Sequence, residues 1–323
     1  MAILPTPKKH DLSSLVMMAS PKSPDIAHQL SLLVCDGWAD YALMDIGEGR
    51  RLERFGRFLV DRPEEQAMGK RQNPALWATA DAVFDAQAGG IEGRWTMAGG
   101  GPAPERFSLS WDGLPFHGRF TAFRHMGFFP EQALHWRHIV NSVSALQSQG
   151  INQPKLLNLF AYTGLASLVA ARAGAHVTHV DASKRAIAHA RDNQTMAGLD
   201  DKPIRWLIDD AVAFVARERR RGNSYHGIIL DPPKFGRGPK GEEWELFDHL
   251  PAHLADCVEL LANDGAFMVL SAYAIRASAL ALDDLMRLSF EGRGGTITSG
   301  ELAIRTESGD RLLSTSLFSH WST

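Results

Sequence analysis

The sequence predicts an α/β protein, with a doubly wound, mostly parallel sheet of seven strands and a smaller N-terminal β-rich domain. Beyond about residue 120, short apolar runs alternate with stretches of helix length. Apolar runs without polar alternation are typical of strands buried on both faces, and their alternation with helices is typical of a parallel sheet. Before that point, short strand-like segments such as DYALMDIG and RFSLSW are broken by glycine-rich turns, which indicates antiparallel hairpins.

The predicted domains follow from these changes in pattern. Residues 1–30 are rich in Pro, Ser and Lys, so we expect an irregular lead-in. Residues 31–118 form the β-rich accessory domain, a candidate substrate-binding domain. Residues 119–323 form the α/β domain.

Bulk composition places the chain among globular proteins. Its 323 residues are 45% hydrophobic, which is enough for about two packed domains. The two cysteines, Cys35 and Cys257, lie too far apart to suggest a disulfide framework or a metal cluster. No apolar run approaches the ~18 residues of a membrane span, and the start lacks the apolar core of a signal peptide. We therefore expect a cytoplasmic protein without a metal or a membrane partner.

The charge of the chain restricts how it could bind nucleic acid. The net charge is −3 and the pI is about 6.5, so a nucleic-acid site would have to be a local patch. Arginines 217, 219, 220 and 221 are the richest candidate. The alternative, which we favour, is favourable charge at a helix C-terminus that ends at Gly222.

The elements of the α/β domain are predicted in order. In EQALHWRHIVNSVSAL, the apolar residues repeat at a 3.6-residue period, which predicts an amphipathic helix. Five strands follow it: KLLNLF, HVTHV, IRWLI, HGIIL and GAFMVLS. The tail segments ITSGELAIR and LLSTSLFSHWS are separated by a turn and predict an antiparallel pair at the sheet edge.

Candidate ligand-binding residues follow the first two of these strands. Gly164 stands where the chain turns from strand to helix, and ligands bind at such turns in doubly wound sheets. Asp181 follows the next strand, at about the spacing expected for a carboxylate that accepts ribose hydroxyls. The structural alternative is that Asp181 or Ser183 caps the following helix.

The third and fourth strands end in acidic residues as well. Asp209 and Asp210 follow IRWLI, and we favour Asp210 as an acceptor for an adenine amino group over a role at the helix start. Asp231 begins DPPKFGRGPKG, in which two prolines fix the backbone and can leave carbonyls pointing into a cleft. The glycines that follow predict a mobile, basic loop.

Together these residues resemble class I S-adenosylmethionine-dependent methyltransferases, which have a Rossmann-like fold, and more narrowly the bacterial 23S rRNA methyltransferases with a DPPKF motif. In that branch a G-[FY]-[FY]-x-[DE]-Q segment covers the cofactor, and here it reads GFFPEQ. The resemblance implies that the cofactor is S-adenosylmethionine. It places these residues around the cofactor: Phe128, Gln132, Phe160, Tyr162, Thr163, Gly164, Asp181, Ala182, Ser183 and Asp210.

The resemblance also implies a catalytic group. Asp231 would lie by the transferred methyl, and Asp231 with the carbonyls beside Pro232 and Pro233 would orient a nitrogen nucleophile. Lys234 would contact phosphate or shape the loop. Cytosine-5 enzymes of this branch carry a cysteine after the fifth strand, whereas this chain has Ser271, Ala272 and Tyr273. A base nitrogen can attack a sulfonium methyl without a thiolate, so the sequence favours nitrogen methylation.

The leading expectation is therefore an RNA methyltransferase that acts on ribosomal RNA at a base nitrogen. The β-rich segment shows no match to the RNA-binding PUA module of that branch. A methyltransferase of a small molecule or a protein is the alternative, which the mild acidity and the missing module favour. A non-catalytic module that binds the cofactor or RNA is a third reading, against which the intact DPPKF argues. Oligomeric state and the methylated atom are left open.

Overall fold

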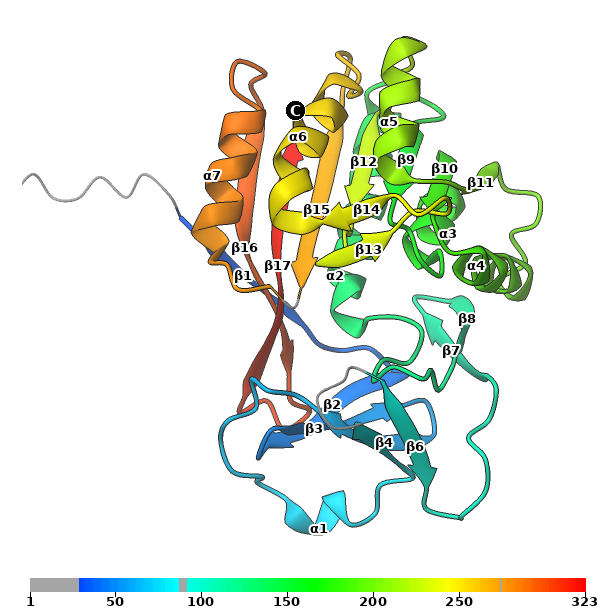
Figure 1. Cartoon of the computed structure of the whole chain (residues 1–323), viewed down its shortest axis with the longest axis vertical. Helices are drawn as coiled ribbons and strands as arrows, with labels where there is room; N and C mark the ends of the chain where they lie inside the picture. Colours follow the sequence, from blue (N-terminus) through cyan, green and yellow to red (C-terminus); the bar gives the residue numbers. More distant parts are fainter. Residues whose placement is uncertain (1–28, 87–91, 274) are drawn as a thin grey trace, which may run out of the picture.

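The computed structural model describes residues 29–86, 92–273 and 275–323. The predicted lead-in, residues 1–30, lies outside these ranges apart from its last two residues. Figure 1 shows an α/β layer with a smaller β-rich part packed against one end of it. This arrangement matches the predicted fold class.

The large sheet has eight strands in the order β1-β16-β17-β15-β12-β9-β10-β11. Its central strands are parallel, and β17 runs antiparallel to both β15 and β16. All five predicted parallel strands and the predicted antiparallel tail pair are present. The bounds are β1 Ser31–Cys35, β9 Lys155–Leu159, β10 His176–Asp181, β11 Ile204–Ile208, β12 Gly227–Leu230, β15 Phe267–Tyr273, β16 Thr296–Arg305 and β17 Leu312–Ser322.

Two predictions about this sheet are corrected. It has eight strands instead of seven, because β1 pairs in parallel with β16. β1 therefore belongs to this sheet and not to the predicted accessory domain of residues 31–118, and it displaces the tail pair from the edge. Gly300 on β16 permits the pairing, since a Cβ there would lie 1.7 Å from the carbonyl oxygen of Ser31.

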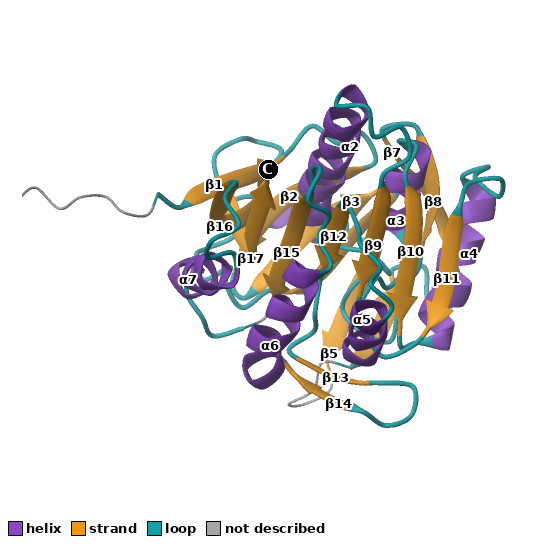
Figure 2. Ribbon diagram, turned by 90° about the horizontal axis from the view of Figure 1, so that it is seen from above, coloured by secondary structure: helices purple, strands orange, loops and turns teal. Residues whose placement is uncertain are grey.

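Helices cover both faces of the sheet, as a doubly wound fold requires. In Figure 2, α2, α3 and α4 lie on one side of the strands, and α5, α6 and α7 lie on the other. Leu254 and Met286 pack in the core of the second side, and Ile139 and Val143 pack in the core of the first. The bounds are α2 Ala133–Ser148, α3 Leu165–Arg172, α4 Lys184–Met196, α5 Ala211–Arg220, α6 Leu246–Glu259 and α7 Ala279–Ser289.

The N-terminal part is built of hairpins, as predicted. Its five-stranded sheet has the order β2-β3-β4-β5-β6, and β7 and β8 form a separate hairpin. Glu48 and Gly49 both have positive φ, which suits the tight turn between β2 and β3. The bounds are β2 Tyr41–Gly47, β3 Arg50–Phe55, β4 Phe58–Pro63, α1 Pro74–Trp77, β5 Ala82–Ala86, β6 Gly93–Met97, β7 Phe107–Trp111 and β8 Leu114–Gly118.

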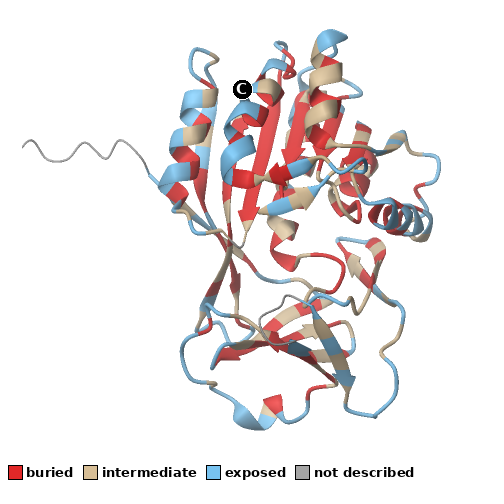
Figure 3. Cartoon of the chain, in the orientation of Figure 1, coloured by how far each residue is buried: buried red, intermediate tan, exposed pale blue. Residues whose placement is uncertain are grey.

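One aromatic core joins the two parts. Phe128 has ring centroids 5.0 Å from Phe116 and 5.8 Å from Phe55, and Trp38 lies 5.9 Å from Trp136 on α2. Figure 3 shows buried residues in both parts, and one cluster of buried side chains contains residues of both. The N-terminal part is therefore packed on the α/β layer through a shared core.

The segment after Asp231 differs from the expected loop. Residues 235–245 form the hairpin of β13 Phe235–Arg237 and β14 Glu243–Glu245. Trp244 anchors it, because its indole Nε1 donates to the carbonyl of Pro233 at 2.7 Å and its ring lies 4.8 Å from Phe160.

The arginine run fits its structural interpretation. Arg217, Arg219 and Arg220 lie in the last turn of α5, with Arg221 as the C-cap. Arg217 pairs with Asp209, Arg219 pairs with Asp256 and Glu259, and Arg221 lies 2.8 Å from Glu218. Three of the four arginines are thus paired with carboxylates, so the run offers less free charge to an RNA than its sequence suggests.

Within the ranges that the structure describes, no helix is long and apolar enough to cross a membrane. Among the same residues, no group of three or more His, Cys, Asp or Glu side chains is placed to hold a metal ion.

Candidate active site

A cavity lies at the carboxyl ends of β9, β10, β11 and β12. Its volume is about 310 Å³, at the lower end of the ~300–1,000 Å³ typical of small-molecule sites. The order of the strands reverses between β9 and β12, which is the point where doubly wound sheets bind ligands. A smaller hollow of about 50 Å³ adjoins it and shares Phe129, Phe160, Tyr162 and Asp231 with it.

The cavity and the hollow bring together most of the predicted site residues. Predicted residues that line the larger cavity are Phe160, Tyr162, Asp181, Ala182, Ser183, Asp210, Asp231 and Pro233. Predicted residues that line only the smaller hollow are Phe128, Gln132, Thr163 and Gly164. Pro232 and Lys234 line neither of them.

The turn between β9 and α3 is held in an uncommon backbone conformation. Phe160 and Tyr162 have φ of 54° and 49°, and Gly164 has φ of 83°. Positive φ in non-glycine residues costs about 1–3 kcal/mol and clusters at functional sites. At Gly164 a Cβ would lie 2.8 Å from the Cβ of Ala190, so only glycine fits without a shift of α4.

Asp181 ties this turn to the start of α4. Its Oδ2 accepts from the backbone N–H of Tyr162 at 2.8 Å, and its Oδ1 accepts from the N–H of Ser183 at 2.7 Å. Burial raises the pKa of Asp181, against the two amide hydrogen bonds that lower it. The N-cap of α4 is Ser183, whose Oγ accepts from the N–H of Ala186 at 3.2 Å. The capping role therefore belongs to Ser183, and Asp181 lines the cavity.

Asp210 has both features that the sequence offered as alternatives. It caps α5, since its Oδ1 accepts from the N–H of Ala213 at 2.8 Å, and it also lines the cavity. The neighbouring Asp209 lines the cavity too and is paired with Arg217. Contact of Asp210 with an adenine amino group stays a prediction.

Asp231 is the chemically unusual group of the cavity. Its Oδ1 is buried and has no hydrogen-bond partner among the described residues, whereas Gln132 Nε2 donates to its Oδ2 at 3.5 Å. The same Nε2 lies 3.3 Å from the Oγ of Ser271. Burial, together with the negative charge of Glu131, raises the pKa of Asp231 to about 7. The carboxyl is thus poised to change its protonation near neutral pH.

Of the DPPKF residues after Asp231, only Pro233 lines the cavity. The carbonyl of Pro233 already accepts from Trp244, so it is partly satisfied inside the protein. Lys234 holds its Nζ 5.1 Å from the centroid of the Phe235 ring.

Phe128 is 3% exposed and packs in the aromatic core, although it borders the smaller hollow.

Four ring-bearing residues of the cavity lie outside the predicted set. Phe129, His125, Tyr273 and Trp244 all line it. The double aromatic in GFFPEQ was a signal for Phe129, and Tyr273 lies directly at the end of β15. Neither His125 nor Trp244 has a signal in the sequence, because each reaches the site through the path of its loop or hairpin.

Fold and site together define a class I methyltransferase: a doubly wound sheet with acidic residues after β10, β11 and β12 and an Asp-Pro-Pro at the switch point. Residues 99–285, more than half of the chain, match the sequence profile of the S-adenosylmethionine-dependent methyltransferases. The chain belongs to this family and is an enzyme with S-adenosylmethionine as its cofactor.

Solved structures agree with this assignment. A SAM-dependent methyltransferase from Agrobacterium tumefaciens is 49% identical, with a TM-score of 0.86 over 91% of this chain and 94% of that one. A candidate SAM-dependent methyltransferase from Streptococcus mutans is 17% identical, with a TM-score of 0.66 over 87% of this chain and 75% of that one. The second likeness shows the fold alone.

Curated relatives match over shorter stretches. Ribosomal RNA large subunit methyltransferase I of Shewanella denitrificans is 38% identical over 28% of this chain and 23% of its own length. Methyltransferase K/L of Shewanella baltica is 34% identical over 47% of this chain and 20% of its own length. The chain thus matches less than a quarter of the length of either relative.

Proposed function

We propose that this enzyme methylates a base nitrogen of RNA, with ribosomal RNA as the leading substrate, and that it does so without a cysteine nucleophile. The observation that carries the proposal is the buried Oδ1 of Asp231, which has no hydrogen-bond partner among the described residues and belongs to a cavity-lining side chain. A buried acceptor without a partner is costly, and an N–H donor of the methyl acceptor would satisfy it.

The residues around the cavity fit S-adenosylmethionine. Asp181, Ala182 and Ser183 would hold the ribose, Asp210 the adenine, and the turn from Phe160 to Gly164 the methionine portion. Phe128 and Gln132 would complete the binding site. Gly164 fits this role because its missing Cβ lets the backbone approach closely. When bound, the cofactor supplies a methyl group on a positively charged sulfur.

Asp231 would act by positioning. As a carboxylate it accepts a hydrogen bond from the attacking amino or imino group and so orients the nitrogen lone pair. Gln132 steadies Asp231 from the α2 side, and Pro232 and Pro233 restrict the backbone that carries it. Lys234 lies outside the cavity, where it would contact RNA phosphate.

Neither cysteine is suited to attack a pyrimidine. Cys35 donates to the carbonyl of Pro130 and Cys257 is packed in α6, and neither lines the cavity. Burial raises the pKa of the Cys35 thiol to about 12 and raises the pKa of Cys257 as well. Both thiols are therefore protonated at neutral pH, and only a thiolate could add to carbon 6.

The choice of ribosomal RNA rests on the names of the Shewanella relatives, which are ribosomal RNA large subunit methyltransferases. Such a substrate places the enzyme with ribosomes in the cytoplasm. Mass spectrometry of ribosomal RNA nucleosides from a deletion strain and its parent tests the proposal. We expect one methylated nucleoside to disappear in the deletion strain, and an unchanged profile would contradict an rRNA substrate.

A trapping experiment separates nitrogen from carbon methylation. RNA containing 5-fluorocytidine forms a stable conjugate with an enzyme that adds a thiolate to carbon 6. We expect no band that survives denaturing electrophoresis, and we expect Cys35→Ser/Cys257→Ser to retain methylation. A conjugate that disappears in either single variant would identify a nucleophile and refute nitrogen methylation.

A small-molecule or protein substrate is the second candidate. The net charge of −3 favours it, since binding of RNA phosphates draws on basic residues. To decide between the two, the enzyme is incubated with tritiated S-adenosylmethionine and either a ribosomal RNA fraction or a protein and metabolite fraction of the deletion strain. The fraction that becomes labelled contains the substrate.

A further inference from the structure

Residues 121–129 connect β8 to the 3-10 turn Pro130–Gln132 and carry rings into the cavity. His125 and Phe129 line the cavity from this loop, and Tyr273 lines it from the end of β15. The ring of Phe129 lies 5.3 Å from that of His125 and 5.4 Å from that of Tyr273, between centroids. Phe123, which is 38% exposed, stacks on His125 at 5.7 Å. A row of rings thus leads from the surface into the cavity that contains Asp231.

The N-terminal domain holds this loop at three carbonyls. Arg62 Nη1 on β4 donates to the carbonyl of Arg124 at 2.9 Å. From β6, Trp95 Nε1 donates to the carbonyl of Thr121 at 2.6 Å, and the N–H of Gly93 donates to the carbonyl of Ala122 at 3.0 Å. The shape of this cavity wall therefore depends on residues outside the α/β domain.

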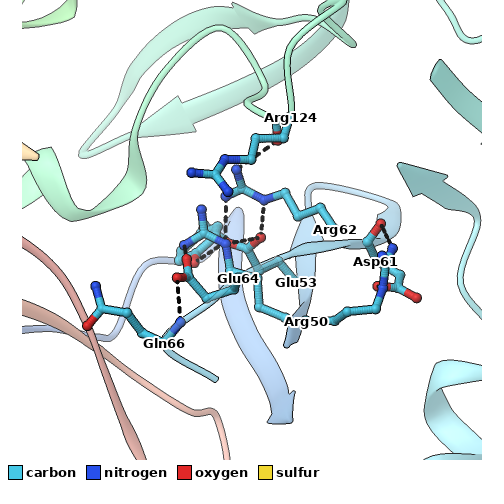
Figure 4. Close-up of polar contacts among 9 residues, drawn as sticks. Arg50, Glu53, Asp61, Arg62, Glu64, Gln66 and Arg124 are labelled. Atoms are coloured by element: carbon cyan, nitrogen blue, oxygen red, sulfur yellow. Dashed lines mark hydrogen bonds and ion pairs between the residues drawn. The ribbon is translucent and has the colours of Figure 1, made fainter. Parts of the chain in front are cut away.

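Arg62 is itself fixed by a buried ion pair, which Figure 4 shows. Its Nε lies 2.5 Å from Glu53 Oε2 and its Nη2 lies 2.9 Å from Glu53 Oε1, which also accepts from the hydroxyl of Tyr41 at 2.7 Å. Arg62 is 2% exposed and Glu53 is fully buried. Two-point pairing leaves Nη1 aimed in one direction, at the carbonyl of Arg124.

We propose that the N-terminal domain builds the acceptor subsite of the enzyme: through Arg62 it holds loop 121–129, whose rings, with Tyr273, stack on one nucleobase flipped out of the RNA beside Asp231. This inference rests on the proposed function, because it takes the acceptor to be an RNA base. Single bases are commonly recognised by stacking on aromatic side chains, and enzymes that modify a base take it out of its stack.

The electrostatics of the loop agree with stacking. Burial, with the charges of Arg62 and Arg124, lowers the pKa of His125 to about 4. Its imidazole is therefore neutral at pH 7 and presents an uncharged ring to the base. Asp231 lines the same cavity, so a stacked base would have its edge within reach of that carboxyl.

The first experiment tests the rings. Phe129→Leu and Tyr273→Leu should raise KM for ribosomal RNA of the deletion strain at least tenfold, with the Kd for S-adenosylmethionine within twofold of wild type. Phe247→Leu is the matched control, an aromatic on α6 that is 49% exposed and lines neither hollow. An unchanged KM for RNA, or a loss of cofactor affinity that parallels the change in KM, would overturn the subsite.

The second experiment tests the role of Arg62 as a positioning residue. Arg62→Lys keeps the charge but cannot keep both the two-point pair and the bond to Arg124. Arg50→Lys is its matched control, since Arg50 pairs with Asp61 at 2.5 Å and donates to the carbonyl of Phe84 at 3.2 Å, away from the loop (Figure 4). We expect backbone amides of residues 121–129 to exchange hydrogen at least tenfold faster in Arg62→Lys only, with KM for RNA raised more than kcat is lowered.

Trp95→Phe provides an independent variant that leaves the ion pair intact. It removes the donor to Thr121 but keeps a ring against Phe84 and Phe120, so it should also speed exchange in the loop. Unchanged exchange in both Arg62→Lys and Trp95→Phe would refute the holding role. The exchange measurement needs no acceptor, so its failure is distinct from a failure of wild-type enzyme to methylate RNA.

Discussion

In the proposed site, single residues at the strand ends would carry the chemistry, and their positions along the chain could be predicted from the sequence. Asp181 and Asp231 each follow an apolar run, and parallel strands end at one edge of a sheet. Contacts between these residues and side chains far away in the sequence could not be predicted in this way. Gln132 lies 99 residues from Asp231, and only the fold brings its amide to that carboxyl.

We predict that Asp181→Asn weakens binding of S-adenosylmethionine at least about tenfold. An amide offers one acceptor oxygen and no charge, and a hydrogen bond to a charged group is worth roughly 1.5–3 kcal/mol. Calorimetric titration measures the change. Ser278→Ala serves as the control, since it removes the N-cap of α7 outside the cavity and should lower stability by about 1 kcal/mol without a change in affinity. Wild-type affinity in a folded Asp181→Asn variant would contradict the ribose assignment.

The pKa of Asp231 predicts how the rate depends on pH. The carboxylate form accepts the hydrogen bond, so kcat/KM for the acceptor should rise with pH through about 7 and then level off. Glu131→Gln removes the negative charge that raises the pKa of Asp231, and it should move the midpoint to lower pH. A midpoint that stays fixed or moves upward would contradict this coupling. Asp231→Asn should lose activity by orders of magnitude while binding of cofactor is retained.

At the scale of elements, helices and strands that have a clear apolar pattern could be predicted. Strands that depend on pairing with a segment far along the chain could not. The run EQALHWRHIVNSVSAL became α2, preceded by the turn Pro130–Gln132. β1 was misplaced because its partner β16 lies more than 260 residues away, and the five residues SLLVC alone do not indicate a sheet. The β13–β14 hairpin was taken for a loop because Gly236, Gly238 and Gly241 interrupt its sequence, whereas Trp244 fixes it.

Three histidines on α2 and β17 should contribute to a dependence of stability on pH. His320 Nε2 lies 2.9 Å from His135 Nδ1, and its ring stacks on His138 at 4.0 Å. Burial lowers the pKa of all three, that of His135 to about 3. Each is neutral in the fold but binds a proton in the unfolded chain below its ordinary pKa of 6.5. Stability should therefore be full above pH 6.5 and fall below it.

The slope of this loss should be roughly 1.4 kcal/mol per pH unit for each histidine that is protonated in the unfolded chain and still neutral in the fold. Urea unfolding between pH 7.5 and 4.5 measures it. His320→Gln removes one titrating group and should make the slope of the unfolding free energy shallower than that of wild type. Equal slopes for wild type and His320→Gln would show that His320 does not contribute.

At the scale of the whole molecule, the two parts share one core, so we expect them to fold as one unit. Tyr41 and Phe55 of the N-terminal sheet share a core with Phe128, Trp136 and Leu168 of the α/β layer. The hairpin of β16 and β17 also reaches the N-terminal sheet, where Arg311 lies 3.5 Å from Asp45. The sequence indicated two domains because the pattern changes near residue 120, but periodicity does not reveal packing between them.

We predict that the chain unfolds in a single calorimetric transition and that a fragment of residues 119–323 does not fold. The fragment loses β1, which exposes the edge of β16, and it leaves Phe128 and Trp136 without their aromatic partners. Exposed apolar surface and an open strand edge favour aggregation. Near-ultraviolet circular dichroism should show no fixed aromatic environment in the fragment. The full chain is the control, and a fragment 119–323 with native-like spectra and cooperative unfolding would mean that the α/β layer is an independent domain.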